Sequence, residues 1–280
     1  MPAPEQLADG VWRLALPSAT LPPYDHTNSY LVFDGPRGVL VDAGGGEARA
    51  LSDLGAALAA LGVTDLGALL LTHTHPDHCA GAEAVAKHYD VPVLVHPFER
   101  DRLSFPTQPL QGGERALAGR LELRALHTPG HSPGHLSFWV PHARAALVGD
   151  LLAAQGSTWV GHPEGDVSDY LASLGRLAEL DAAVFGPGHG PPVLKPASRL
   201  REVRAHRLGR ETEVLQALRQ PRTLAALKAQ VYPDVPATLE GLVEGTLRAH
   251  LGKLLREGRV VMTSDAHYQR VTGANREPVG

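Results

Sequence analysis

Short apolar segments alternate with amphipathic segments between residues 30 and 186 of the chain. Each apolar segment is rich in valine, leucine or aromatic residues and is bounded by glycine, proline or aspartate, which is typical of buried strands. The predicted strands are Tyr30–Phe33, Val39–Asp42, Ala68–Thr72, Val91–Val95, Leu121–Leu126, His135–Val140, Ala145–Gly149 and Ala183–Phe185. Helices are predicted at Glu47–Leu61, Glu83–Tyr89 and Ser168–Leu180, the last with Ser168 as its N-cap. This order predicts an α/β fold of packed sheets flanked by helices.

A proline-rich segment, Pro187–Pro196, ends this pattern, and a helical pattern follows it. The predicted elements are a long basic helix at Ser198–Arg219, helices at Thr223–Val231 and Thr238–Glu257, and strands at Arg259–Thr263 and His267–Val271 around a turn at Ser264–Ala266. Two helices followed by a two-stranded hairpin are typical of a winged helix-turn-helix. We therefore predict a catalytic domain at residues 1–197 and a linker helix plus winged-helix domain at 198–280. The second domain is interpreted either as a nucleic-acid contact or as a packing or dimerisation unit.

The net charge of −4 is unevenly distributed between the two modules. Residues 1–198 carry 12 Lys and Arg against 21 Asp and Glu, whereas residues 199–270 carry 13 against 8. A basic module suits phosphate contact, because cationic side chains dominate nucleic-acid affinity. Against this, the isoelectric point is only 6.4, and few aromatic residues are available for base stacking, with Phe105, Trp159 and Tyr268 as candidates. The alternative is that the arginine-rich helices are merely well solvated.

The composition indicates a protein that works in a reducing compartment. With 280 residues, 43% of them hydrophobic, the chain can bury a substantial core. No apolar run approaches the roughly 20 residues that a membrane helix needs, and the first ten residues do not resemble an export signal. The single cysteine, Cys79, cannot form an internal disulfide and is interpreted as a buried, unreactive thiol. We therefore expect a cytoplasmic protein with no membrane partner.

Candidate chemistry is concentrated in the 15 histidines. The predicted strand Ala68–Thr72 leads directly into His73, His75, Asp77 and His78. Imidazole and carboxylate groups are ligands for zinc, iron and manganese. Burying four such groups without a compensating partner costs several kcal/mol, so their density predicts a metal site.

Three further candidate ligands follow predicted strands downstream: His131, Asp150 and His189. Taken singly, a histidine in a turn rich in glycine and proline is usually a surface residue. Together they repeat one arrangement, in which a ligand-type side chain stands where a buried strand ends, and functional groups gather on such loops.

These motifs resemble those of the metallo-β-lactamase-fold hydrolases. The matching segments are THTHPDH (72–78), TPGHSPGH (128–135), GD (149–150) and GPGHG (186–190). The resemblance implies an αββα sandwich with a two-metal site at the sheet edges. The implied ligands are His73, His75 and His131 for one metal, Asp77, His78 and His189 for the other, and Asp150 as a bridge. Asp42 matches an acid that orients the ligand loop, and Asn28 and Tyr30 match a structural strand start.

The resemblance implies a binuclear metal-dependent hydrolase that uses a metal-bridged hydroxide. The expected cofactors are two divalent ions, zinc foremost, with iron or manganese as alternatives. Asp77 would orient the hydroxide, and His135 would assist catalysis by protonating the leaving group or by supporting the ligands. His162 is a candidate for the substrate mouth.

The branch of the family is indicated by Asp150, because dedicated lactamases place cysteine or another ligand there. The winged helix departs from the glyoxalase II pattern and is similar to the lactamase-like protein 2 group, which includes an endoribonuclease. The predicted activity is therefore phosphodiesterase or endoribonuclease-like, with a glyoxalase II-like thioesterase or lactonase as the alternative. A regulatory binding protein is a third hypothesis. The expected partners are a small-molecule or RNA substrate, with nucleic-acid contact through residues 198–270; the oligomeric state is not predicted.

Overall fold

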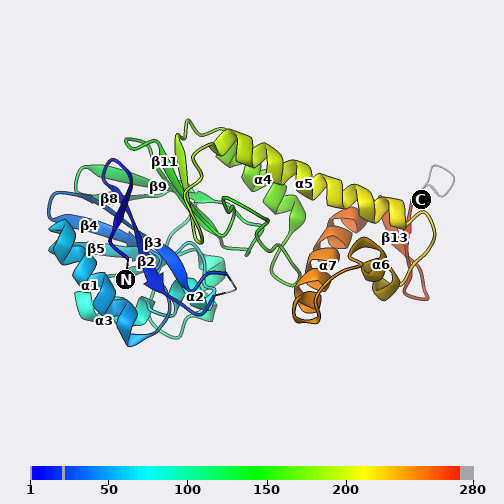
Figure 1. The fold of residues 1–280 in the computed structure, drawn as a ribbon, viewed down its shortest axis with the longest axis horizontal. Helices are drawn as coiled ribbons and strands as arrows, with labels where there is room; N and C mark the ends of the chain where they lie inside the picture. Colours follow the sequence, from blue (N-terminus) through cyan, green and yellow to red (C-terminus); the bar gives the residue numbers. More distant parts are fainter. Residues whose placement is uncertain (1, 21–22, 272–280) are drawn as a thin grey trace.

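The structure is a computed structural model that describes residues 2–20 and 23–271. Two β-sheets pack face to face, and helices cover the outer face of each, which gives the first module four layers in the order α/β/β/α (Figure 1). A smaller helical module with a two-stranded sheet follows at the end of a long helix. The predicted fold class is confirmed.

The first sheet contains seven strands, arranged in the order in which they occur along the chain. They are β1 (Glu5–Ala8), β2 (Val11–Pro17), β3 (His26–Asp34), β4 (Arg37–Val41), β5 (Asp65–Leu70), β6 (Val93–Val95) and β7 (Gln108–Pro109). Strands β1 to β4 pair antiparallel, and β4 to β7 pair parallel. Parallel neighbours need a crossover, and the helices α1 (Ala48–Leu61) and α3 (Ala82–Tyr89) lie in two of these connections.

The second sheet has the strand order β12-β11-β10-β9-β8. Its strands are β8 (Arg115–Ala118), β9 (Leu121–His127), β10 (Leu136–Val140), β11 (Ala145–Gly149) and β12 (Val184–Pro187). Only β11 and β12 pair parallel, and α4 (Val167–Ala178) connects them. The long helix α5 (Pro196–Ala217) packs beside α4, and both contribute to the core on the outer face of this sheet.

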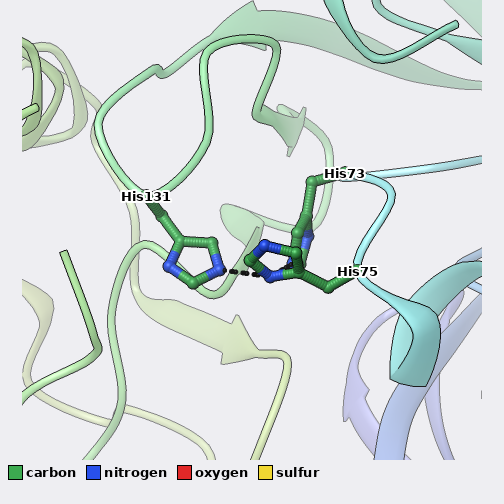
Figure 2. A group of neighbouring side chains, drawn as sticks. All are labelled: His73, His75 and His131. Carbon is green, nitrogen blue, oxygen red and sulfur yellow. Dashed lines mark hydrogen bonds between the residues drawn. The ribbon is translucent and has the colours of Figure 1, made fainter. Parts of the chain in front are cut away.

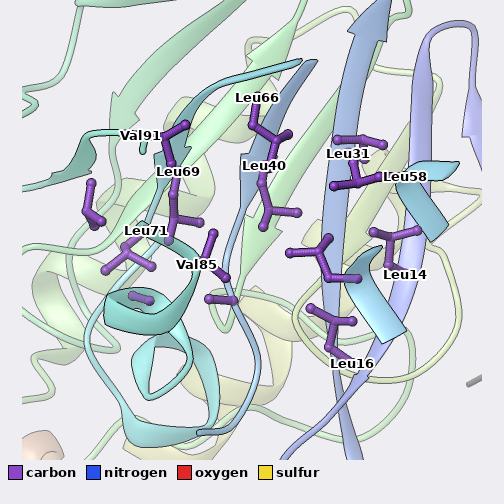
Figure 3. Close-up of a cluster of buried hydrophobic side chains, with 14 of the residues drawn as sticks. Leu14, Leu16, Leu31, Leu40, Leu58, Leu66, Leu69, Leu71, Val85 and Val91 are labelled. Atoms are coloured by element: carbon purple, nitrogen blue, oxygen red, sulfur yellow. The ribbon is translucent and has the colours of Figure 1, made fainter. Parts of the chain in front are cut away.

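Side chains that alternate between the two faces of each strand build two separate hydrophobic cores, one between the first sheet and its helices and one between the two sheets. Leu31, Leu40 and Leu69 face the helices and form a leucine-rich layer beneath α1 and α3 (Figure 3). Their neighbours Val32 and Val39 belong to the core between the two sheets. Since successive side chains of a strand point to opposite faces, one apolar run supplies both layers.

Three local predictions are wrong. Between Val95 and Leu121 no strand is predicted, yet the short strands β7 and β8 lie there. No strand is predicted before Tyr30, yet β1 and β2 lie there. In β2, Trp12 and Arg13 are half-exposed, which interrupts the apolar run. The predicted N-cap of α4, Ser168, is also incorrect, because the carboxylate of Asp166 accepts hydrogen bonds from the backbone N–H groups of Ser168 and Asp169.

The second module has the winged-helix order that the sequence predicts. It contains α6 (Leu224–Val231), a 3-10 turn η2 (Ala237–Leu239), α7 (Glu240–Arg256), β13 (Val260–Met262) and β14 (Tyr268–Arg270). Thr223, predicted as the first residue of this helix, is its N-cap, and its hydroxyl accepts a hydrogen bond from the backbone N–H of Ala226. Within residues 2–20 and 23–271, no helix is both long and apolar enough to cross a membrane.

Many cations of the second module are directed inward. On α5, Arg199 donates to the backbone carbonyls of Ala153 and Gly156, and Arg207 donates to that of Thr158. These guanidinium groups fix a loop of the first module to the long helix. Charge counted from the sequence therefore overstates the charge that this module offers to a phosphate backbone.

His250 of α7 is fully buried, and neither of its ring nitrogens has a hydrogen-bond partner. Burial, together with the charges of Arg207 and Arg210, lowers its pKa to about 3. The nearby Lys253 is also buried and pairs with Glu211 at 2.6 Å. The folded chain therefore keeps the His250 ring neutral where the unfolded chain protonates it.

We expect the stability of the protein to fall as the pH drops below about 6.5, in part through His250. The folded pKa is depressed, so this contribution is fully present above the unfolded value and is lost as the pH falls toward the folded value. One proton changes the unfolding free energy by about 1.4 kcal/mol per pH unit. His250→Leu should therefore lose about 2 kcal/mol less than the wild type between pH 6.5 and 5, measured by urea unfolding. Identical pH dependence in both proteins would contradict this assignment.

Candidate metal centre

Seven histidine and aspartate side chains meet at one end of the sandwich, where strands of both sheets end. They are His73 and His75 after β5, Asp77 and His78 in the short helix α2 (Pro76–Cys79), His131 between β9 and β10, Asp150 after β11, and His189 after β12. The rigid strands therefore fix the starting point of every ligand-bearing loop.

The first group consists of His73, His75 and His131. The Nδ1 atom of His75 lies 3.0 Å from Nε2 of His73 and 2.9 Å from Nε2 of His131 (Figure 2). A ring nitrogen carries one proton or one lone pair in its plane, so hydrogen bonding does not satisfy both contacts. A cation facing all three nitrogens would satisfy them, since nitrogen ligands around a tetrahedral zinc stand roughly 3.4 Å apart.

The second group consists of Asp77, His78 and His189. Nε2 of His189 lies 3.2 Å from Nε2 of His78 and 3.2 Å from Oδ2 of Asp77. This set joins two imidazoles to one carboxylate, a donor set suited to zinc, iron or manganese.

The carboxylate of Asp150 faces both groups. Its Oδ1 lies 3.3 Å from Nε2 of His78 and 3.5 Å from Nε2 of His189, whereas its Oδ2 lies 3.8 Å from Nε2 of His131. The backbone at position 188 comes so close to the Asp150 carboxylate that the residue there must be glycine: a Cβ atom would stand 2.4 Å from Oδ1 of Asp150. The structure thus brings together all seven predicted ligands in the predicted division, and their role as ligands stays a prediction.

The two groups differ in their protonation. Burial lowers the pKa of His73 and that of His131, which leaves neutral rings with available lone pairs. Burial also opposes the charged form of His189, but hydrogen bonds to Asp150 and Asp77 outweigh it and raise the pKa of His189 to about 9. Burial raises the pKa of Asp77, yet the hydrogen bond with His189 prevails and the pKa falls to about 2. A metal ion bound at the second group would therefore displace a proton from His189.

Asp42 orients one ligand through a buried network. It follows β4 with a φ of 58°, and its Oδ1 accepts from the backbone N–H of Thr72 at 2.7 Å. Its Oδ2 accepts from the Thr72 hydroxyl and lies 2.8 Å from Nδ1 of His78. A carboxylate on the outer nitrogen of a ligating histidine directs the inner lone pair to the metal. This contact agrees with the orienting role that the resemblance implies for Asp42.

Asn28 and Tyr30 hold the loop that carries His189. The Asn28 amide donates to the carbonyls of Pro187 and Gly190 at 2.9 and 2.8 Å, and the Tyr30 hydroxyl donates to that of Pro187. Both side chains are buried and bind backbone carbonyls of this loop, which agrees with the structural role that the resemblance implies.

A buried carboxylate that the sequence does not single out, Glu99, links two ligand loops. Glu99 lies in the 3-10 helix η1 (Pro97–Arg102) and accepts from the Thr74 hydroxyl and, at 2.9 Å, from the Gly134 N–H. It is completely buried. In the sequence its charged neighbours are typical of a surface turn, and its partners lie 25 and 35 residues away.

The remaining candidates take different positions. His135 is fully buried, with Nδ1 3.0 Å from the Thr128 hydroxyl and Nε2 unpartnered. Its ring centroid lies 5.3 Å from that of His73, and its complete burial favours a supporting position; its catalytic role stays a prediction. The side chain of His162 is exposed. Cys79 is buried, and burial raises its pKa to about 12, so the thiol is unreactive as expected.

Comparison with known families identifies the class. Residues 22–189 match the model of the metallo-beta-lactamase superfamily, and residues 223–269 match that of the beta-lactamase associated winged helix domain. The chain therefore belongs to the metallo-beta-lactamase superfamily and is a metal-dependent hydrolase. The predicted domain boundary at residues 197 and 198 lies between the two matched regions and stays a prediction.

Similar proteins extend over nearly the whole chain. A beta-lactamase-like protein 2 homolog from Caenorhabditis elegans is 27% identical, over 91% of this chain and 88% of its own length. An atrochrysone carboxyl ACP thioesterase from Passalora fulva is 29% identical, over 93% and 80%. The crystal structure of a metallo-beta-lactamase family protein from Thermus thermophilus is 29% identical, with a TM-score of 0.78 over 95% of this chain and all of that one. Another similar protein, 31% identical over 65% of this chain and 96% of its own, was solved in a di-iron-bound form, with a TM-score of 0.55.

Proposed function

We propose that the protein hydrolyses an acyl thioester at a pair of divalent metal ions held by the seven side chains. His73, His75 and His131 would hold one ion and Asp77, His78 and His189 the other, with Asp150 shared. Bound there, the ions supply an activated water and polarise the carbonyl of the substrate. Zinc and iron both suit this donor set.

One observation favours a thioester over a nucleic acid as the substrate. The arginines beside the ligand loops already have carboxylate or backbone carbonyl partners within the protein. Arg102 pairs with Glu164 at 2.7 Å, and Arg13 donates to the carbonyl of Gly190 at 3.0 Å. Arg207 donates to the carbonyl of Thr158. A nucleic acid carries a negative charge on every phosphate and needs unpaired cations along its binding path. The thioester group is uncharged and has no such requirement.

The chain's own residues fit the chemistry of a thioester. Asp77 is ionised at neutral pH, so a carboxylate oxygen of Asp77 can accept a hydrogen bond from the attacking water and orient it. A thiolate leaves without prior protonation, because the pKa of a thiol is only about 8.5. The buried His135 is then not required as a proton donor.

The names of similar proteins give independent support for a thioester substrate. Three of the relatives bear the name atrochrysone carboxyl ACP thioesterase, at 28 to 31% identity. The endoribonuclease-type activity rests on the resemblance of the whole chain to the lactamase-like protein 2 group, and it is the second candidate that the same assay tests.

The test is a direct comparison of substrates on the full chain loaded with zinc, manganese or iron. We expect thiol release from acyl-pantetheine thioesters or S-lactoylglutathione, and no cleavage of labelled single-stranded RNA. Asp77→Ala should lower kcat at least about 100-fold, while the exposed control Asp101→Ala should leave it unchanged. Cleavage of RNA that depends on Asp77, without thioester hydrolysis, would overturn the proposal in favour of a phosphodiesterase.

A further inference from the structure

Two histidines of the first group receive their outer hydrogen bonds from one loop, the β11–α4 loop of residues 150–166. The backbone carbonyl of Trp159 accepts from Nδ1 of His131 at 2.7 Å. The carboxylate of Glu164 lies 3.2 Å from Nε2 of His75. In each ring the contacted nitrogen is opposite the one that faces the other ligands, since His131 presents Nε2 and His75 presents Nδ1 to the group. Such outer acceptors place the proton on the outer nitrogen and leave the inner lone pair free.

The same loop is docked onto the winged-helix module. The indole N–H of Trp159 donates to the carbonyl of Leu242 at 3.0 Å, and the backbone N–H of His162 donates to that of Gly245 at 2.9 Å. Both acceptors lie in α7. The approach is close: a Cβ atom at position 245 would stand 3.1 Å from the carbonyl oxygen of His162 and 3.2 Å from the Trp159 ring.

Arginines of the second module hold the β11–α4 loop on both sides of Trp159 and His162. Arg207 of α5 donates to the carbonyl of Thr158, one residue before Trp159. Arg256 of α7 pairs with Asp166, at the end of the loop. Arg102 of the first module donates at 2.7 Å to Oε2 of Glu164, the same oxygen that lies near His75.

Among residues 2–20 and 23–271, the outer contacts of His78 and His189 in the second group are made with the first module. Nδ1 of His78 is held by Asp42 at 2.8 Å, and Nδ1 of His189 lies 3.3 Å from the carbonyl of His26. Asp42 and His26 both belong to the first sheet and its loops. Nδ1 of His73 likewise lies 3.0 Å from the hydroxyl of Thr72, which is bound to Asp42. His131 and His75 are therefore the two histidines whose outer contacts come from the β11–α4 loop.

We propose that the winged-helix module acts as a positioning element, which through Trp159 and Glu164 orients His131 and His75 and so sets the affinity of one metal position selectively. This inference rests on the metal pair of the proposed function but not on its substrate. Trp159 and Glu164 are positioning residues: they act on the ligands and do not touch the metal. Arg207 and Arg256, which hold the β11–α4 loop, then contribute to this positioning.

The test measures metal affinity in the full chain. Wild type, Trp159→Phe, Glu164→Gln and Glu164→Ala are titrated with zinc and with cobalt against a chelator, and metal content and the cobalt absorption spectrum are recorded without substrate. Trp159→Phe keeps an aromatic side chain and the backbone carbonyl, but it loses the indole N–H that donates to the carbonyl of Leu242. Matched controls are Trp12→Phe, in β2, and Glu122→Gln, whose carboxylate also pairs with arginines but lies on β9.

We expect Glu164→Ala and Trp159→Phe to weaken one of the two metals about 10- to 100-fold, to change the cobalt spectrum and to leave the other affinity unchanged. Glu164→Gln keeps an acceptor oxygen for His75 and should restore part of the loss. Equal weakening of both metals, or unchanged affinities despite lower thermal stability, would overturn the inference. A wild type that binds no metal contradicts this inference and the proposed function together, whereas failure of thioester hydrolysis alone contradicts only the latter.

Discussion

Asp150→Asn is expected to lower kcat by more than about 100-fold and to reduce the metal content below two equivalents. The carboxylate stands between the two groups, within 3.3 to 3.8 Å of ring nitrogens of His78, His189 and His131. The asparagine keeps the size of the side chain but removes its negative charge and one acceptor oxygen. Both metal positions then lose the ligand they share.

The measurement pairs steady-state kinetics with elemental analysis of the purified protein. Asp101→Asn, an exposed aspartate of η1, is the control and should retain both activity and metal. If Asp150→Asn keeps two equivalents of metal and at least a tenth of the activity, Asp150 is not a shared ligand.

Asp42→Ala should cost about 3–5 kcal/mol of unfolding free energy, the second largest effect that we expect. Asp42 is 1% exposed, and its carboxylate satisfies the backbone and hydroxyl of Thr72 and the ring of His78. Alanine leaves these buried groups without a partner. Position 42 also has a positive φ, at which an aspartate is better tolerated than an alanine.

Asp42→Asn separates folding from metal binding. The amide oxygen can still accept from Thr72, but an amide N–H facing Nδ1 of His78 makes that nitrogen an acceptor. The ring proton then lies on Nε2, the atom that faces His189 and Asp150. We therefore expect Asp42→Asn to be more stable than Asp42→Ala but to bind the second metal about 10- to 100-fold more weakly. Chemical unfolding and chelator competition measure the two quantities, and unchanged metal affinity in Asp42→Asn would contradict the orienting role of Asp42.

The places of the candidate ligands could be predicted because they lie on segments that leave apolar strands. His73 and Asp150 stand immediately beyond runs of buried residues, so their position at a sheet edge depends only on local pattern. The helices of the winged-helix module could also be predicted, since their apolar periodicity is a local signal.

The supporting residues were not predictable, because their partners are remote in the chain. Glu164 meets His75 across 89 residues and Arg102 across 62, and nothing around it distinguishes it from a surface glutamate. The partners of the arginines in α5 could not be predicted for the same reason, since Arg199 and Arg207 donate to backbone carbonyls more than 40 residues away in the chain.

The central claim is that seven side chains hold two metal ions, and anomalous diffraction from crystals of the metal-loaded protein tests it most directly. We predict two peaks at the absorption edge of the loaded metal, one bound by His73, His75 and His131 and the other by Asp77, His78 and His189. Asp150 should contact both peaks. Crystals that show no peak within coordination distance of these side chains, after loading with zinc, iron and manganese in turn, would contradict the account.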